Sequence, residues 1–173
     1  MGNTAGNIYL VGFMGTGKTT IGRELAKFKK WRFADLDELI ELEEKMTIPE
    51  IFSKKGEKYF RGVESRALKE ISREKNFVVA CGGGIVLEKK NIAVMKETGF
   101  MVCLKACPEV ILKRTSLSLN RPLLNTGSPR ERISLLLKLR SPYYALADAE
   151  INTSRLSVKE LARRIAAMPK RRK

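Results

Sequence analysis

The sequence predicts an α/β protein with three layers, in which helices cover both faces of a parallel sheet. Short apolar runs alternate along the chain with longer segments whose apolar residues recur at helical spacing. A glycine-rich segment joins the first apolar run to the first amphipathic segment. The length of 173 residues, with 43% apolar and 31% charged residues, is typical of one globular domain. We therefore expect a single domain that spans residues 1–173.

Five segments have the length and composition of strands, and one of them is weaker than the others. They are Asn7–Val11, Arg32–Leu36 (the weaker one), Phe77–Ala80, Phe100–Leu104 and Glu150–Asn152. Because longer amphipathic segments lie between these runs, we expect the strands to run parallel, with helical crossovers between them.

Four longer segments place apolar side chains on one face of a helix. They are Lys18–Phe28, Gly56–Ser72, Arg130–Ala147 and Leu156–Met168. Capping signals mark three helix starts: Thr47–Glu50 and Ser157–Glu160 match the capping box, and Ser128–Glu131 has proline at the first helical position. Ser116–Ser128 starts no clear helix, and loops of this length inside a domain are usually functional lids or disordered segments.

Residues 12–19 match the phosphate-binding motif G-x-x-x-x-G-K-T in full. The motif follows the first predicted strand and opens the first predicted helix, which is the context it requires. Its glycines let several backbone N–H groups face phosphate oxygens, and the helix N-terminus adds the positive end of its dipole. The sequence therefore predicts that the chain binds a nucleoside triphosphate. The residues assigned to this site are Gly15, Thr16, Gly17, Lys18, Thr19 and Thr20.

Charge and residue usage narrow the chemistry further. Lys and Arg number 34 against 19 Asp and Glu, and the resulting net charge of +15 attracts polyanions such as nucleotides. The chain has no histidine, which excludes a histidine-based triad or zinc site. Cys81, Cys103 and Cys107 are expected to be buried thiols rather than a disulfide framework. With no membrane-length apolar stretch and no signal-peptide pattern, we expect a cytoplasmic protein.

Asp35 and Asp37 follow the second predicted strand and form a candidate acceptor site. A parallel strand ending there places both carboxylates at the carboxyl edge of the sheet, beside the phosphate-binding loop. Alternation along the strand sends both side chains the same way, one toward a metal and the other toward an acceptor hydroxyl. A helix cap followed by a solvated acidic face is the alternative. Gly82–Gly84 after the third strand either approach a ligand with their N–H groups or form a plain turn.

Three arginines are candidates for anion recognition. Arg61 and Arg140 lie in predicted helices, and two such side chains imply an acidic acceptor because guanidinium forks grip carboxylates bidentately. Gly62 follows Arg61 and lowers helix propensity without a local gain, which favours a functional role for this turn. Arg121 in the long loop would stabilise charge on a transferred phosphoryl group. A solvated or ion-paired side chain is the alternative for Arg61 and Arg140, and a mobile surface side chain is the alternative for Arg121.

Taken together, these motifs resemble the shikimate kinase family. The matching segments run in the family's order from about Asn7 to Met168 and are Gly12–Thr19, Asp35–Asp37, Gly56–Glu57, Phe60–Arg61 with Glu64, Gly82–Gly84, Arg121–Leu124, Arg140–Tyr144 and Ala147–Asp148. The resemblance implies a P-loop NTPase fold of the nucleoside-monophosphate-kinase type with a five-stranded parallel sheet. It also implies transfer of the ATP γ-phosphoryl group to the 3-hydroxyl of shikimate, which gives shikimate 3-phosphate and ADP.

The resemblance implies roles on the nucleotide side of the site. Lys18 would hold the phosphates, Thr19 would bind Mg²⁺ directly, and Asp35 would support the ion through water. Arg114 would lie against the adenine, and Arg121 would arrive from a lid at about residues 115–128.

It also implies roles on the acceptor side. Asp37 would orient the acceptor hydroxyl and take its proton. Arg61, Arg140 and the backbone around Gly83 and Gly84 would hold the shikimate carboxylate and ring, within a substrate-binding helical region at about residues 36–74. The expected partners are shikimate and ATP or ADP, with no membrane or nucleic-acid partner, and the expected state is a monomer.

Two other functions stay open at this point. A related P-loop kinase for gluconate or another small hydroxy acid would share the same loop but have a different pocket. A P-loop nucleic-acid-binding module would account for the net charge, but the basic residues are spread along a chain with only 7% aromatics and without aromatic interleaving. Substrate binding does not explain the basic segments Lys29–Trp31 and Lys170–Lys173.

Overall fold

A computed structural model describes residues 6–116 and 128–168 of the chain. The predicted lid, apart from its two ends, lies outside these residues, as do Arg121 and the basic segment Lys170–Lys173. No helix in the two described ranges is long and apolar enough to cross a membrane.

Five parallel strands form one sheet in the order β2-β3-β1-β4-β5. The strands are β1 (Asn7–Val11), β2 (Arg32–Asp35), β3 (Phe77–Ala80), β4 (Gly99–Lys105) and β5 (Ala149–Asn152). The central strand β1 is buried along its whole length and alternates between the two faces of the sheet. The predicted five-stranded parallel sheet is confirmed, and its weaker strand ends one residue earlier than expected.

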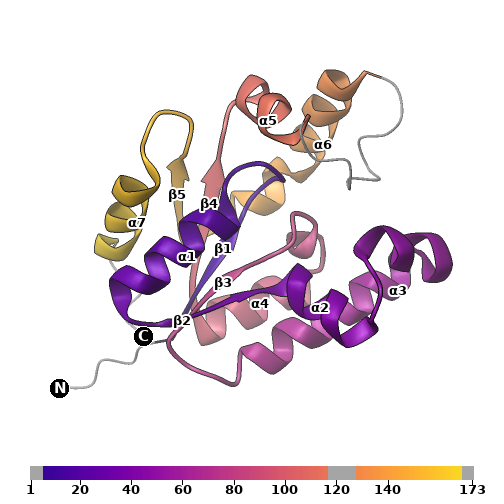
Figure 1. Cartoon of the computed structure of the whole chain (residues 1–173), viewed down its shortest axis with the longest axis horizontal. Coiled ribbons are helices and arrows are strands. Elements are labelled where there is room, and N and C mark those ends of the chain that lie inside the picture. Colours follow the sequence, from indigo (N-terminus) through magenta and orange to yellow (C-terminus); the bar gives the residue numbers. More distant parts are fainter. Residues whose placement is uncertain (1–5, 117–127, 169–173) are drawn as a thin grey trace.

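Helices cover both faces of this sheet (Figure 1). They are α1 (Lys18–Lys29), α2 (Leu36–Glu44), α3 (Ile48–Ile71), α4 (Lys89–Thr98), α5 (Pro108–Thr115), α6 (Pro129–Tyr144) and α7 (Val158–Ala167), with a 3-10 turn η1 at Ile85–Leu87. Helices α1 and α7 lie side by side on one face, where Ile8 and Leu10 of β1 point. Tyr9 and Val11 point into the other layer, which α3, α4 and α6 help to build. The three-layer prediction is confirmed.

The boundaries of α3 correct one prediction and confirm another. The helix begins after Thr47, whose side chain and that of Glu50 form the predicted capping box. It therefore starts eight residues before the predicted Gly56, where the backbone departs from helical geometry with φ 82° and ψ 166°. Because only glycine adopts this region readily, Gly56 divides α3 into two helical sections. The second capping box, at Ser157, is also confirmed. Ser128 forms no side-chain cap, although Pro129 begins α6 as expected.

The cysteine prediction holds for two residues and is wrong for the third. Cys81 and Cys103 are buried, whereas Cys107 is exposed. The reason is that β4 leaves the core at Lys105, so the chain has already turned toward solvent when it reaches the start of α5.

At the amino-terminal edge of the sheet, Asn7 ties together segments that are far apart in sequence. Its side-chain amide donates to the backbone oxygen of Glu74 at 2.9 Å, and its oxygen accepts from the Phe77 N–H at 3.0 Å. Asn7 is buried, so these bonds satisfy polar groups that would otherwise be desolvated without partners. This edge lies opposite the one that carries the glycine-rich loop.

Candidate active site

The glycine-rich loop connects β1 to α1 in the geometry that phosphate binding requires. Gly12 leaves the strand with φ 136°, and a Cβ there would collide with the carbonyl of Leu104 on β4. Gly17, in the left-handed region, precedes α1 and offers no side chain to cap it. The first N–H groups of α1 are therefore open to an anionic ligand, which the positive end of the helix dipole also favours.

Lys18 folds back over this loop. Its Nζ donates to the carbonyl oxygens of Gly12 at 2.8 Å and Phe13 at 2.9 Å. These contacts keep the ammonium group beside the phosphate-binding N–H groups, where it can attract β- and γ-phosphate oxygens. Thr20, also predicted to contact the nucleotide, lines the same pocket.

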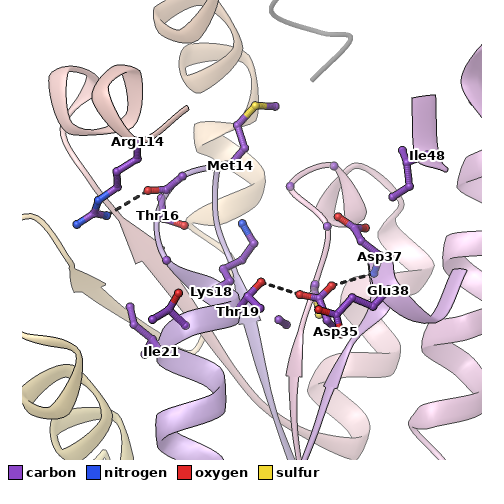
Figure 2. A pocket seen from close by; sticks show the side chains of 18 of the residues that line it. Met14, Thr16, Lys18, Thr19, Ile21, Asp35, Asp37, Glu38, Ile48 and Arg114 are labelled. Carbon is purple, nitrogen blue, oxygen red and sulfur yellow. Dashed lines mark hydrogen bonds between the residues drawn. The ribbon is translucent and has the colours of Figure 1, made fainter. Parts of the chain in front are cut away.

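A clamp from two later segments holds the other side of the loop. Arg114 on α5 donates to the carbonyl of Gly15 in the loop at 3.1 Å (Figure 2). It also donates to the carbonyl of Thr153 at 3.2 Å. Thr153, which follows β5, donates its hydroxyl to the carbonyl of Thr16 at 2.9 Å and is buried. No role was predicted for Thr153 from the sequence, although it directly follows a predicted strand, where site residues of parallel sheets often lie.

Thr19 and Asp35 bring the loop and β2 together. The Thr19 hydroxyl donates to Asp35 Oδ2 at 2.6 Å, while Asp35 Oδ1 accepts from the Asp37 N–H at 3.0 Å and so caps α2 (Figure 2). The helix-cap interpretation of Asp35 is confirmed, and its carboxylate also faces the loop, whereas the roles toward a metal and an acceptor stay predictions. A hydroxyl and a carboxylate beside a phosphate cradle form an oxygen donor set of the kind that suits Mg²⁺.

Asp37 reaches the pocket for a different reason from the one predicted. It belongs to the first turn of α2 rather than to the strand, so helix geometry and not strand alternation sets its direction. Its Oδ1 is buried and has no hydrogen-bond partner within the described ranges. Burial, and to a lesser extent the charge of Asp35, raises the pKa of Asp37 to about 6, while Lys18 acts in the opposite direction. With a pKa this close to neutral pH, the carboxylate can act as a general base.

Glu64 on α3 is a second buried carboxyl that the sequence analysis left without a role. Its side chain has no solvent exposure, and burial raises its pKa to about 7 although Arg61 acts in the opposite direction. Oε1 of Glu64 lacks a partner among the residues described and lies near Gly82. The signal for it was the three-residue spacing from Arg61 on an otherwise apolar helix face.

Arg61 and Arg140 are both largely removed from solvent, unlike surface arginines. The Arg61 side chain is 12% exposed and pairs with Glu64 at 2.8 Å and Glu57 at 3.1 Å. Arg140 on α6 is buried, with its guanidinium 5.7 Å from the ring centre of Phe13. A partly unpaired cationic pair of this kind can bind an acidic ligand, since Arg61 Nε is buried and has no partner in the described part of the chain.

The glycine segment after β3 lets these groups come close. A Cβ on Gly84 would overlap the Arg61 guanidinium, and one on Gly83 would lie 3.3 Å from a terminal nitrogen of Arg140. Gly82–Gly84 form a turn that the side chains of Arg61 and Arg140 approach closely, while the approach of a ligand to its N–H groups stays a prediction. By contrast, a Cβ on Gly62 would meet no atom within 4 Å, so the structure gives no steric reason for that glycine.

One pocket of about 720 Å³ contains both the phosphate cradle and the acidic and arginine groups. A volume of this order accommodates a small-molecule ligand. It brings together every predicted site residue in the described ranges: Gly15, Thr16, Gly17, Lys18, Thr19, Thr20, Asp35, Asp37, Arg61, Gly83, Gly84, Arg114 and Arg140.

A P-loop at the end of the central parallel strand, facing a carboxylate and an arginine pair in one pocket, defines a P-loop kinase for a small anionic acceptor. A sequence model of the shikimate kinase family matches residues 14–169. The chain belongs to the shikimate kinase family.

Individual relatives agree with this assignment. The chain is 46% identical to the shikimate kinase of Thermodesulfovibrio yellowstonii over 159 residues, and this match covers 92% of each chain. The structure of the present chain matches that of shikimate kinase from Acinetobacter baumannii in complex with shikimate, with a TM-score of 0.91 and 41% identity. The match covers 94% of this chain and 92% of the other. A gluconokinase from Sinorhizobium meliloti matches with a TM-score of 0.58 at 15% identity, which shows a shared fold alone.

Proposed function

We propose that this kinase transfers the γ-phosphoryl group of ATP to the 3-hydroxyl of shikimate, which gives shikimate 3-phosphate and ADP. The observation that carries the proposal is the placement of Asp37 in one pocket with the Arg61–Arg140 pair and the phosphate-binding loop. One oxygen of its carboxyl group is buried and has no partner among the described residues. An acceptor with one carboxylate and a hydroxyl group suits this arrangement.

On the nucleotide side, the N–H groups of residues 15–20 and the Lys18 ammonium would hold the phosphates. The contact between Thr19 and Asp35 supports a Mg²⁺ site, in which Thr19 would be a direct ligand and Asp35 would act through water. When bound, the ion would neutralise charge on the β- and γ-phosphates. Arg114, held beside Gly15, would lie against the adenine. The role of Arg121 stays a prediction.

On the acceptor side, Arg61, Arg140 and the Gly83–Gly84 backbone would hold the carboxylate of shikimate. Their convergence at one wall of the pocket supports this role, because two guanidinium groups can form paired hydrogen bonds to a carboxylate. This grip would fix the orientation of the ring and so hold its 3-hydroxyl toward Asp37.

Asp37 would orient the hydroxyl and accept its proton during transfer. A bond forms between the hydroxyl oxygen and the γ-phosphorus, the bond from that phosphorus to the bridging oxygen of ADP breaks, and the proton passes to Asp37. Phosphoryl transfer needs little covalent chemistry from the protein, so positioning and charge stabilisation supply most of the rate enhancement. We further propose that the enzyme is cytoplasmic and acts as a monomer. Residues of one chain line the pocket, which supports the monomeric state.

The test is ADP release measured by a coupled assay with MgATP and shikimate, gluconate or nucleoside monophosphates as acceptors. We expect turnover with shikimate and background release with the others. ADP release that depends on gluconate and not on shikimate would instead assign the pocket to a different hydroxy acid.

A further inference from the structure

The side chain of Tyr144 makes a short hydrogen bond to the glycine segment after β3. Its hydroxyl donates to the carbonyl oxygen of Gly83 at 2.6 Å, from the last turn of α6. The residue is 5% exposed, and burial raises the pKa of its phenol to about 12. The hydroxyl therefore stays protonated near neutral pH and remains a donor to Gly83.

The carbonyl that Tyr144 holds belongs to the central peptide of a tight turn. The Ile85 N–H donates to the carbonyl of Gly82 at 3.2 Å, which closes a four-residue turn with Gly83 and Gly84 in the middle. Gly84 has φ −99° and ψ 0°, the values of the third residue of a type I turn.

Glycine at this third position leaves a second turn form open. Types I and II differ by a flip of the central peptide, and type II requires a positive φ that glycine adopts without steric cost. The bond that closes the turn, from Ile85 to Gly82, is compatible with both forms. The hydrogen bond from Tyr144 is not, because a flipped peptide would turn the Gly83 carbonyl away from the hydroxyl.

The same peptide carries the Gly84 N–H, which points opposite to the Gly83 carbonyl because the peptide is trans. Gly83 and Gly84 line the pocket, whereas Tyr144 does not. Neither glycine N–H donates to another residue within the described ranges. A carbonyl held from behind by Tyr144 thus leaves the Gly84 N–H directed to the pocket side, where Arg61 approaches Gly84.

We propose that Tyr144 is a positioning residue whose hydroxyl selects the type I form of the Gly82–Ile85 turn and so directs the Gly84 N–H at the acceptor carboxylate. The part concerning the acceptor rests on the function proposed above. Arg140, one helical turn earlier, interacts with the same hydroxyl. The phenol therefore links the peptide to one of the two arginines that would bind the same carboxylate.

The test compares Tyr144→Phe with the matched control Tyr143→Phe, because each variant loses one hydroxyl and keeps its ring. Loss of a neutral hydrogen bond of ordinary strength should raise the KM for shikimate about 3- to 10-fold in Tyr144→Phe. The KM for ATP and kcat should stay within about 2-fold of the wild-type values, as should all constants of the control. An analogue with the carboxylate reduced to an alcohol should bind equally to wild type and Tyr144→Phe.

A second readout needs no acceptor. In ¹⁵N-labelled protein, the nuclear Overhauser effect from Gly83 Hα to the Gly84 amide proton is weak in a type I turn and strong in type II. We expect it to strengthen in Tyr144→Phe and to stay weak in Tyr143→Phe. An unchanged pattern, or an equal KM rise in both variants, overturns the proposal. If the wild type shows no turnover with shikimate but Tyr144→Phe still changes the turn, the role of Tyr144 in the turn is supported and the proposed function is wrong.

Discussion

The carboxyl groups of Asp37 and Glu64 meet over the Cα of Gly82. A Cβ at that position would lie 3.1 Å from Asp37 Oδ1 and 2.5 Å from Glu64 Oε1, and both oxygens are buried without a partner in the described part of the chain. The charge of Asp37 contributes to the raised pKa of Glu64. Two acidic groups whose pKa values approach neutrality thus share one wall of the pocket, in a chain that has no histidine.

Replacing the proposed base should separate catalysis from nucleotide binding. We expect Asp37→Asn to lower kcat at least about 100-fold, because general base catalysis contributes on this order, and to leave ATP affinity within about 3-fold. Steady-state kinetics and a nucleotide titration measure the two effects. Glu43→Gln is the control, since Glu43 is an exposed carboxylate on the same helix and pairs with Arg66. Near-normal turnover in Asp37→Asn would show that another group accepts the proton.

The pH dependence of kcat/KM for shikimate should report the same carboxyl. The pKa of Asp37 is raised from 3.8 to about 6, so the basic form is lost as the pH falls through 6. We expect kcat/KM to decline below about pH 6, with one proton taken up by the free enzyme. Initial rates measured between about pH 5 and about pH 8 cover this transition. A flat profile in the wild type would contradict the assignment.

The arginine pair should govern acceptor binding. Arg61→Ala and Arg140→Ala should each raise the KM for shikimate about 10- to 100-fold, the cost of losing a hydrogen bond to a charged group. ATP affinity should change little, because neither side chain contacts residues 12–20 through a hydrogen bond in the described structure. Lysine at either position should restore the charge but not the forked geometry, so recovery should be partial. An unchanged acceptor KM would refute the role in carboxylate binding.

Two glycine-to-alanine changes should affect different properties: one should weaken shikimate binding and the other should raise stability. Gly84→Ala places a methyl group where the Arg61 guanidinium lies, so we expect a higher KM for shikimate. Gly62→Ala adds a methyl group to open space within α3 and should raise the free energy of unfolding by about 0.5–1 kcal/mol, because alanine favours helix. Kinetics and urea denaturation measure both variants. Equal acceptor KM values in the two would show that Arg61 moves aside at no cost.

Glu64 should make the stability of the protein depend on pH. Its pKa is raised from 4.5 to about 7 on folding, so the folded state holds the proton more tightly than the unfolded state does. The stabilising contribution is therefore complete below about pH 4.5 and is lost as the pH rises through about 7. Relative to Glu64→Gln, the wild type should lose free energy of unfolding between these values. Parallel urea midpoints across the range would mean that Glu64 does not change its proton affinity on folding.

Local patterns predicted the sheet and the phosphate-binding loop because each is encoded in a short stretch of sequence. The apolar runs of the strands and the full motif at residues 12–19 need no distant partner to be recognised. Periodicity alone did not indicate helix α2, because its buried residues are few, Leu36 and Ile40, while Leu39 and Leu42 face outward.

Contacts between distant segments could not be predicted in the same way. Glu64 is buried because Arg61 and the glycine segment after β3 surround it, and Thr153 acquires its partners only when β5 comes to lie beside β4. Asp37 was predicted as a site residue with the wrong local geometry, because the strand ends at Asp35 and Asp37 lies in the first turn of α2. In each case, long-range packing sets the environment of the side chain.

The hydrogen bonds of Asn7 hold the amino-terminal edge of the sheet together. They join the start of β1 to the segment before β3, whereas the predicted catalytic groups in the described ranges occupy the opposite edge. These bonds therefore lie outside the pocket, and a substitution beside them would leave every predicted site residue in the described ranges in place.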